Sequence, residues 1–266
     1  MAVLHNTLRD LLDAGKPTMG THFLSHDPDI PEFIGDTGLF DYAEFVAEYA
    51  TFDMPLLFHL ARAAQCGNLP LMIKLDQANE TFWAQMALGA GFKAVLFTDI
   101  RTPEDVERVH QAIRPDTPEQ GGLMGVKLRR PALGGYELQG YAADLDSVVT
   151  VIMIEKKVAV ENIDAILTTA QERRIDMTQW GPTDFRFSYG PAAEMDADDD
   201  RAAEELVIRK SLEYGVAPRI EIGAVEQAQR YIDLGVRHFC IGWDRALMQA
   251  HFRALGEGLR PLLDDL

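Results

Sequence analysis

The 266-residue sequence has only two cysteines, Cys66 and Cys240, which lie far apart in apolar surroundings. Neither belongs to a CxxC pair or to a Cys/His spacing typical of zinc ligands. We therefore expect two buried free thiols and assign them no chemistry.

Basic residues are also scarce, with 25 Lys and Arg against 42 Asp and Glu, a formal net charge of -17. Long-range repulsion opposes binding to nucleic acid or to an anionic membrane surface, so we expect neither as a partner. A small acid held in a local cationic pocket remains compatible with this charge.

Long apolar runs are absent: no stretch approaches the ~18 residues that a membrane helix needs. The amino-terminal segment MAVLHNTLRDLLDAGKP reads as an amphipathic helix start and lacks a charged-then-apolar signal pattern. We expect a cytoplasmic protein. With 47% hydrophobic residues the chain can bury a large core, and we expect a single domain over residues 1–266.

Short β-rich runs alternate with helical patterns along the whole chain. The runs are TMGTHFL, FDYAEFVAE, LPLMIKL, KAVLFTDI, VTVIMIE, DMTQWGP, PRIEIGA and HFCIGWD. Eight strand and helix units in this length predict an α/β protein with a (β/α)8 TIM barrel. A doubly wound open sheet is the alternative, but it normally carries a Gly-rich phosphate turn after its first strand, and MGTHF has none.

Two segments depart from the repeat. Residues 115–141, rich in Gly and basic residues, predict a long loop excursion between the fourth and fifth strands. The last segment, about 245–264, predicts a helix with an apolar stripe that packs either on its own barrel or on a neighbour. The stripe consists of Leu247, Phe252, Leu255, Leu259 and Leu262.

The stretch from Val151 to Tyr189 carries the most specific chemical signal. It reads as a strand ending at Glu155, a helix, a second strand and the turn GPTDF with Asp184. The carboxyl ends of parallel strands are where ligands bind, and two carboxylates there suit a hard divalent cation. The alternative is that both residues cap the helices that follow them.

The same strand-end rule gathers a wider set of polar residues at one mouth of the barrel. Its members are His22, Glu48, Tyr49, Lys74, Asp76, Asp99, Arg101, Glu155, Asp184, Glu221 and Asp244. Helix capping, neighbouring ion pairs or simple solvation explain several of them, so we expect about half to be functional.

These segments resemble the HpcH/HpaI aldolases, which are grouped with the citrate lyase β-like and macrophomate synthase proteins. The resemblance runs through most of the chain. It is carried by AGKPTMGTHFLSHDP, FDYAEFVAEYA, GFKAVLFTDIRTPEDVERV, IMIEKKVAVENIDAI, WGPTDF and AQRYIDLGVRHFCIGWDRALM. It implies a TIM barrel of the type that binds phosphoenolpyruvate or pyruvate.

The resemblance also implies a carbon-carbon lyase that acts next to a 2-oxo acid through a metal-stabilised enolate. Glu155 and Asp184 match the family's metal ligands, for Mg²⁺ or Mn²⁺, with Co²⁺ as a further option. The turn Gly181, Pro182, Thr183 and Asp184 matches the segment that holds the substrate carboxylate on backbone N–H groups. The alternative is that Gly181 and Pro182 serve only to form a tight turn in an ordinary loop.

The chain departs from the family at four positions. Tyr49 stands where family aldolases have the acid-base histidine, and Val46 replaces that histidine's aspartate companion. Lys74 stands in place of an arginine, keeping the charge and losing the fork geometry. Met153 replaces a glutamine. A tyrosine is a poor base at neutral pH, so the acid-base role falls to Glu48, Tyr49 or His22.

Three functions follow from these residues. The first is a metal-dependent aldolase that acts on a 2-oxo acid or related carboxylate, with Tyr49 in place of the family histidine. The second is a decarboxylase or hydratase-type lyase on the same metal-enolate platform. The third is a catalytically silent relative that binds a metal and an acid. The resemblance also implies a homo-oligomer, trimer or hexamer, in which the terminal helix is exchanged between subunits.

Overall fold

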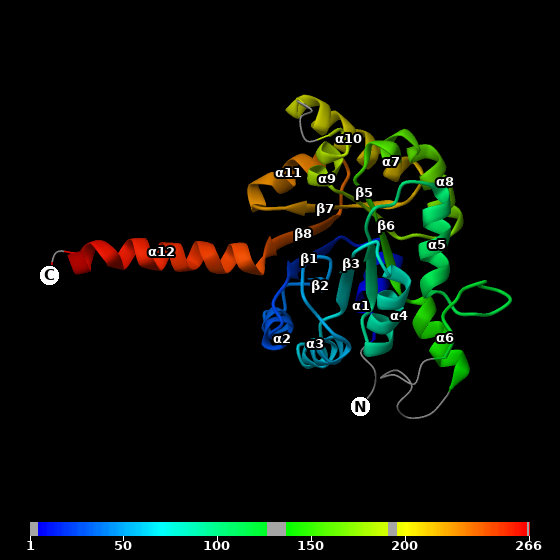
Figure 1. Ribbon diagram of the computed structural model, residues 1–266, viewed down its shortest axis with the longest axis horizontal. Helices are drawn as coiled ribbons and strands as arrows, with labels where there is room; N and C mark the ends of the chain where they lie inside the picture. Colours follow the sequence, from blue (N-terminus) through cyan, green and yellow to red (C-terminus); the bar gives the residue numbers. More distant parts are fainter. Residues whose placement is uncertain (1–4, 127–136, 191–195, 265) are drawn as a thin grey trace.

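The computed structural model describes residues 5–126, 137–190, 196–264 and 266. Its centre is a closed parallel barrel with its strands in chain order, ringed by helices (Figure 1). The strands are β1 (Thr18–Phe23), β2 (Tyr42–Val46), β3 (Leu71–Leu75), β4 (Ala94–Phe97), β5 (Val149–Ile154), β6 (Met177–Trp180), β7 (Ala217–Ile222) and β8 (His238–Trp243). All eight lie in the runs predicted from the sequence, except that β7 begins one residue earlier, at Ala217, and the (β/α)8 TIM-barrel prediction is confirmed.

Helices follow the strands in the order that such a barrel requires. They are α1 (Thr7–Asp13), α2 (Asp29–Asp36), α3 (Met54–Cys66), α4 (Glu80–Ala90), α5 (Pro103–Ile113), α6 (Leu138–Asp146), α7 (Lys157–Glu161), α8 (Ile163–Glu172), α9 (Pro182–Phe187), α10 (Ala197–Glu213), the 3-10 turn η2 (Val225–Gln227), α11 (Ala228–Asp233) and α12 (Asp244–Asp264). Local sequence sets several starts: Thr102 and Asp105 form a capping box before α5, and Asp53 caps α3.

The side chains of each strand alternate between two apolar layers, as the two-residue period of a strand requires. Phe45, Ile73 and Val95 point outward and pack beneath the helices in the larger core. Tyr42, Met72, Leu96, Val151 and Met177 point inward and fill the barrel itself. The strand ends above this inner layer are therefore free to carry polar groups.

A buried ion pair crosses the barrel interior. The Arg219 guanidinium donates hydrogen bonds to the Glu44 carboxylate and, at 2.6 Å, to the Tyr42 hydroxyl. All three side chains are fully buried. Gly20 makes room for them, because a Cβ at that position would lie 2.2 Å from the Tyr42 ring. Such a pair depends on each partner satisfying the other, since an isolated buried charge is costly.

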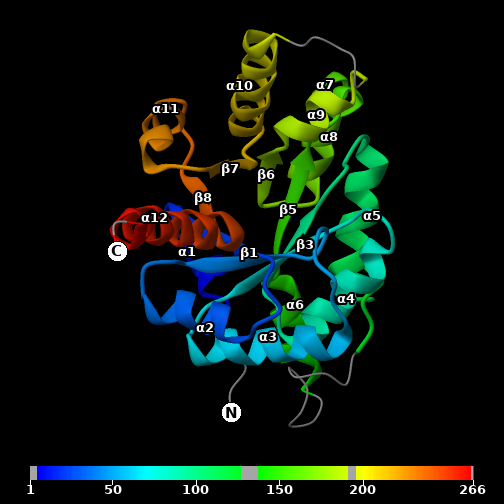
Figure 2. The same ribbon diagram turned by 60° about the vertical axis from the view of Figure 1, so that its left-hand side comes forward.

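The terminal helix α12 extends away from the barrel (Figures 1 and 2). Its apolar stripe is exposed: Leu247, Phe252, Leu255, Leu259 and Leu262 are between 55% and 69% accessible. The stripe therefore does not pack on the chain's own barrel, which was one of the two expected arrangements.

Two further expectations need correction. Cys66 is exposed at the end of α3, whereas Cys240 is buried as expected. The predicted loop excursion of 115–141 ends early because α6 begins at Leu138, and residues 127–136 of it lie outside the described residues. Within the described part of the chain, no helix is long and apolar enough to cross a membrane.

Candidate active site

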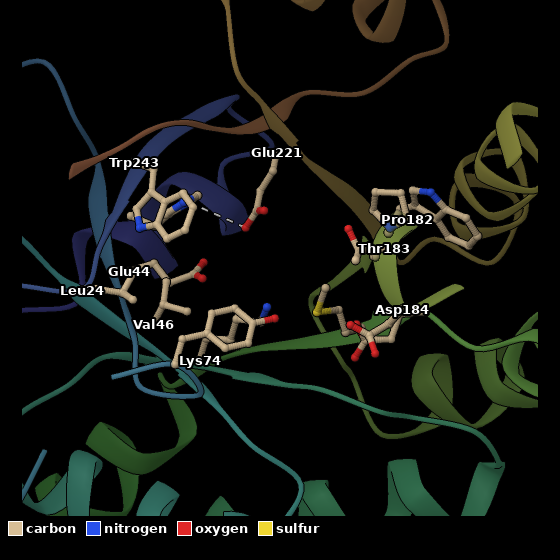
Figure 3. Close-up of a pocket in the computed structure, with 15 residues that line it drawn as sticks. Leu24, Glu44, Val46, Lys74, Pro182, Thr183, Asp184, Glu221 and Trp243 are labelled. Carbon is tan, nitrogen blue, oxygen red and sulfur yellow. Dashed lines mark ion pairs between the residues drawn. The ribbon is translucent and has the colours of Figure 1, made fainter. Parts of the chain in front are cut away.

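A cavity of ≈ 310 Å³ opens at the carboxyl end of the barrel (Figure 3). Most of the predicted site residues line it, namely His22, Tyr49, Lys74, Glu155, Gly181, Pro182, Thr183 and Asp184. Glu48 reaches the same region through its ion pair with Lys74. Figure 3 places Thr183 and Asp184 on one side of the cavity, and Trp243 and Glu221 on the other.

Glu155 follows directly after β5 and is almost completely buried. The backbone N–H of Asp99 donates to its Oε1 atom at 2.8 Å. Gly181 permits this position, because a Cβ there would lie 2.7 Å from Oε2 and 2.6 Å from the Glu155 Cβ. Burial raises the pKa of Glu155 to about 7, and nearby Asp184 also raises it, while the Asp99 N–H and Lys74 lower it.

Asp184 lies in the first turn of α9 and faces the same cavity. Its Oδ1 atom accepts a hydrogen bond from the Lys156 ammonium at 2.6 Å. The same ammonium lies 3.0 Å from Oδ1 of Asp99. Asp99 has a φ of 58°, in the left-handed region, which directs its N–H to Glu155 and its carboxylate to Lys156.

The donor set fits a divalent cation that prefers oxygen ligands. Glu155 is a carboxylate whose pKa is raised chiefly by burial, and a cation bound beside it would favour its ionised form. Asp184 offers a second carboxylate oxygen on the neighbouring strand's turn. Lys156 shares one Asp184 oxygen and is the competing cation at this position. Helix capping does not account for Glu155, because the backbone N–H that donates to it belongs to Asp99, in the preceding βα loop.

Lys74, Glu48 and Tyr49 form a compact group on the β2–β3 side. The Lys74 ammonium lies 2.8 Å from Oε2 of Glu48 and 5.0 Å from the centre of the Tyr49 ring. Burial lowers the pKa of Lys74, but Glu48, Glu221 and Tyr49 raise it further, so that the net pKa lies above its ordinary value. Lys74 is therefore a permanent cation and not a neutral amine.

Tyr49 is 58% exposed, and its pKa is raised to about 12, chiefly by partial burial, with Lys74 opposing and Glu48 adding to the shift. Its phenol stays protonated at neutral pH. It can donate a hydrogen bond into the cavity, and it has little capacity to remove a proton.

Residues that sequence reasoning missed also shape the cavity. Lys156 was not among the candidates, although its position directly after Glu155 was a signal that it lies at the strand end. Trp243, Trp180 and Leu24 provide apolar walls. Of the wider strand-end set, Asp76 and Asp244 accept hydrogen bonds from nearby backbone N–H groups, which is a structural role.

Comparison with known proteins places this architecture in a family. A model of the HpcH/HpaI aldolase/citrate lyase family matches residues 41–250. The 5-keto-4-deoxy-D-glucarate aldolase of Salmonella paratyphi C (strain RKS4594) is 24% identical over 257 residues, which cover 96% of this chain and 97% of that protein.

Solved structures agree in fold. An HpcH/HpaI aldolase/citrate lyase family protein from Burkholderia cenocepacia J2315 matches with a TM-score of 0.85 and 24% identity, covering 96% of this chain and 100% of that one. Macrophomate synthase matches with a TM-score of 0.75 and 18% identity, covering 96% and 90%. Since the family model covers most of the sequence, this chain belongs to the HpcH/HpaI aldolase/citrate lyase family.

Proposed function

We propose that this protein is a divalent-metal-dependent carbon-carbon lyase of the aldolase type that acts on a 2-oxo acid or a related carboxylated substrate. Family membership supports the reaction class. The observation that carries the proposal is that Glu155 and Asp184, from neighbouring βα units, line one cavity together with the Lys74 cation.

Glu155 and Asp184 would hold the metal, with Mg²⁺ or Mn²⁺ as the expected ion and Co²⁺ as a further option. When bound, such an ion supplies Lewis-acid stabilisation of the enolate that forms as the bond next to the keto group breaks. Lys74 adds a fixed positive charge in the same cavity, beside the oxygen on which negative charge develops.

The turn from Gly181 to Asp184 would receive the substrate carboxylate. The first turn of a helix has backbone N–H groups without intrahelical partners, and those of Thr183 and Asp184 lie at the start of α9. Pro182 at the first helical position sets the backbone for this turn. The proton is moved by Glu48, Tyr49 or His22.

The metal ligands provide the main test. We expect Glu155→Ala and Asp184→Ala to abolish metal-dependent release of pyruvate from hydroxylated 2-oxo acids, while Glu161→Ala, an exposed acidic residue on α7, leaves it unchanged. Thermal melting checks that the variants fold. Full activity of the wild-type enzyme in excess chelator would contradict the proposed metal dependence.

Decarboxylation of a 2-oxo diacid is a second candidate. The observation that favours it is the Tyr49 phenol, whose pKa of about 12 makes it a poor base, because loss of CO₂ needs no base to start carbon-carbon cleavage. Parallel assays of oxaloacetate decarboxylation and of pyruvate release from hydroxylated 2-oxo acids distinguish the two functions. At equal enzyme and metal concentrations, the faster reaction identifies the function.

We further propose a homo-oligomer, trimer or hexamer, in which α12 packs on a second copy of this chain. A groove of ≈ 610 Å³ lies against the outer faces of β1 and β8, with Met19, Leu39, Phe239 and Ile241 in its lining. Because α12 extends away from the barrel (Figure 1) and its apolar stripe is exposed, the stripe is available to cover the groove of a neighbour.

The assembly is tested by light scattering during size-exclusion chromatography. We expect the wild-type mass to correspond to three or six chains, and Phe252→Asp with Leu255→Asp to give a monomer, because charges replace the apolar stripe. Glu257→Gln lies on the face of α12 opposite the apolar stripe, because the helix has 3.6 residues per turn, and it should leave the mass unchanged. A monomeric wild-type protein would contradict this proposal.

A further inference from the structure

The side of the cavity opposite Asp184 holds a histidine and a carboxylate in contact range. His22, near the end of β1, has a side chain that is 17% exposed, and its Nδ1 atom lies 3.8 Å from Oε1 of Glu221 on β7. Both residues line the cavity. Figure 3 draws their ion pair as a dashed line beside Trp243.

Glu221 is held as an anion from the barrel interior. Gln179 Nε2 donates to its Oε1 atom at 2.9 Å, and Arg219 Nη1 lies 3.9 Å from the same oxygen. Burial raises the pKa of Glu221, but Arg219, His22 and Lys74 lower it, and the net shift is downward. A fixed carboxylate beside an imidazole favours the tautomer with its proton on the facing nitrogen.

The neighbours of His22 fix which ring nitrogen is available. Nδ1 faces the barrel interior, 3.5 Å from the buried Cys240 Sγ as well as near Glu221. The Trp243 ring packs against the imidazole with a centroid distance of 5.8 Å. Nε2 lies on the opposite edge of the ring, and among the described residues no hydrogen-bond partner takes it. Since His22 lines the cavity, Nε2 is the atom free for a substrate.

We propose that His22, positioned by Glu221, is the proton-transfer group of this site. The inference rests on the proposed function and selects one of its three candidate groups. Tyr49 has a pKa of about 12 and remains protonated, and Glu48 is bound to Lys74 at 2.8 Å. The pair lies on β1 and β7, so the acid-base function is relocated relative to Tyr49, which follows β2.

The proton step balances without any further reactant. With pyruvate as substrate, Nε2 of His22 takes one proton from the methyl carbon. The electrons of that C–H bond form the carbon-carbon double bond, and the π electrons of the keto group move onto its oxygen to give the enolate. The imidazole becomes an imidazolium, whose charge Glu221 offsets. In the reverse direction Nε2 returns the proton to the same carbon.

The test is exchange of the methyl protons of pyruvate with D₂O, followed by ¹H NMR in the presence of Mn²⁺ or Mg²⁺. General acid-base groups contribute about 10²- to 10⁴-fold. We therefore expect His22→Asn and His22→Gln to slow the exchange at least 100-fold, while Mn²⁺ affinity, measured by electron paramagnetic resonance, stays within twofold of wild type. His59→Asn, an exposed histidine on α3, is the matched control and should exchange at the wild-type rate.

Glu221 is a positioning residue and needs a separate readout. We expect Glu221→Gln to lower kcat for exchange about tenfold with an unchanged KM for pyruvate, and Glu221→Asp to recover part of that loss. A change in KM alone, or equal losses in the Asp and Gln variants, would mean that Glu221 has only a structural role and would overturn its assignment.

The possible failures are distinct. If the wild-type enzyme shows no metal-dependent exchange, the proposed function itself fails, and this inference fails with it. If wild-type exchange is present and His22→Asn and His22→Gln retain it within threefold, only the inference is overturned. The same conclusion follows if both variants lose Mn²⁺ binding or melt far below wild type, because His22 then supports the structure and not the proton step.

Discussion

The two sides of the cavity hold their charges differently. On the β5–β6 side, Glu155 is buried with one backbone donor, and Asp184 is paired with the partly exposed Lys156. On the β2–β3 side, Lys74 and Glu48 form a nearly buried pair that is closed on itself. The first side has carboxylate oxygens to offer to a cation, whereas the second presents a fixed positive charge. Metal binding and the stabilisation of negative charge on the substrate are therefore served by separate walls.

Of changes at Lys74, Lys156 and Tyr49, removing the positive charge of Lys74 should have the largest effect on kcat. We expect Lys74→Met to lower kcat about 10²- to 10³-fold, because a preorganised cation beside a developing negative charge contributes on that order. Lys74→Arg should stay within about tenfold, since it keeps the charge and the Glu48 partner. Steady-state kinetics of pyruvate release measures both. Equal losses in the two variants would indicate that packing, not charge, is what Lys74 provides.

Removing the competing cation should change metal affinity in the opposite direction. We expect Lys156→Met to tighten Mn²⁺ binding about tenfold, because the ammonium 2.6 Å from Asp184 repels a cation and shares its ligand oxygen. Titration calorimetry or electron paramagnetic resonance gives the affinity. Lys157→Met is the matched control, since its side chain is 51% exposed and pairs only loosely with Glu161 at 3.9 Å. Weaker Mn²⁺ binding by Lys156→Met would reverse our assignment of the competition.

The smallest effect is expected at Tyr49. We predict that Tyr49→Phe lowers kcat by less than about threefold, because the phenol, with a pKa of about 12, is not a base at neutral pH and contributes at most one hydrogen bond. The pH-rate profile should keep its shape. A loss of 100-fold would restore Tyr49 as the replacement for the family histidine and would add proton transfer to the β2–β3 side.

The TIM barrel could be predicted from the sequence because the local strand patterns and the number of strand and helix units indicate the same fold. Each strand is a short apolar run with turn signals around it, and the order of eight such units leaves few alternatives to a barrel. The predicted loop over residues 115–141 was wrong at its end, because α6 begins at Leu138 inside a segment whose Gly-rich composition indicated a loop. Cys66 is exposed because it lies on the outer side of the last turn of α3, whose Ala63 and Ala64 face the core.

The candidate site was predictable only in part. Residues at strand ends, such as Glu155 and Lys74, follow from the rule that parallel strands share one edge. The partners of those residues do not, because pairings such as Arg219 with Glu44 cross the barrel between positions 175 residues apart. Likewise the contacts between His22 and Glu221 depend on the closure of β8 onto β1, which periodicity does not reveal.

Asp99 follows the end of β4 with a φ of 58°. For a residue with a Cβ, that conformation carries a conformational cost on the order of 1 kcal/mol, which the surrounding structure must offset. A glycine would relieve the cost but would remove the carboxylate beside Lys156, and a relaxed backbone would turn the N–H away from Glu155. The left-handed conformation of this one residue is therefore part of what positions Glu155 and Lys156. Although β4 supplies no proposed metal ligand itself, Asp99, just beyond its end, orients the carboxylate of Glu155 after the neighbouring strand β5.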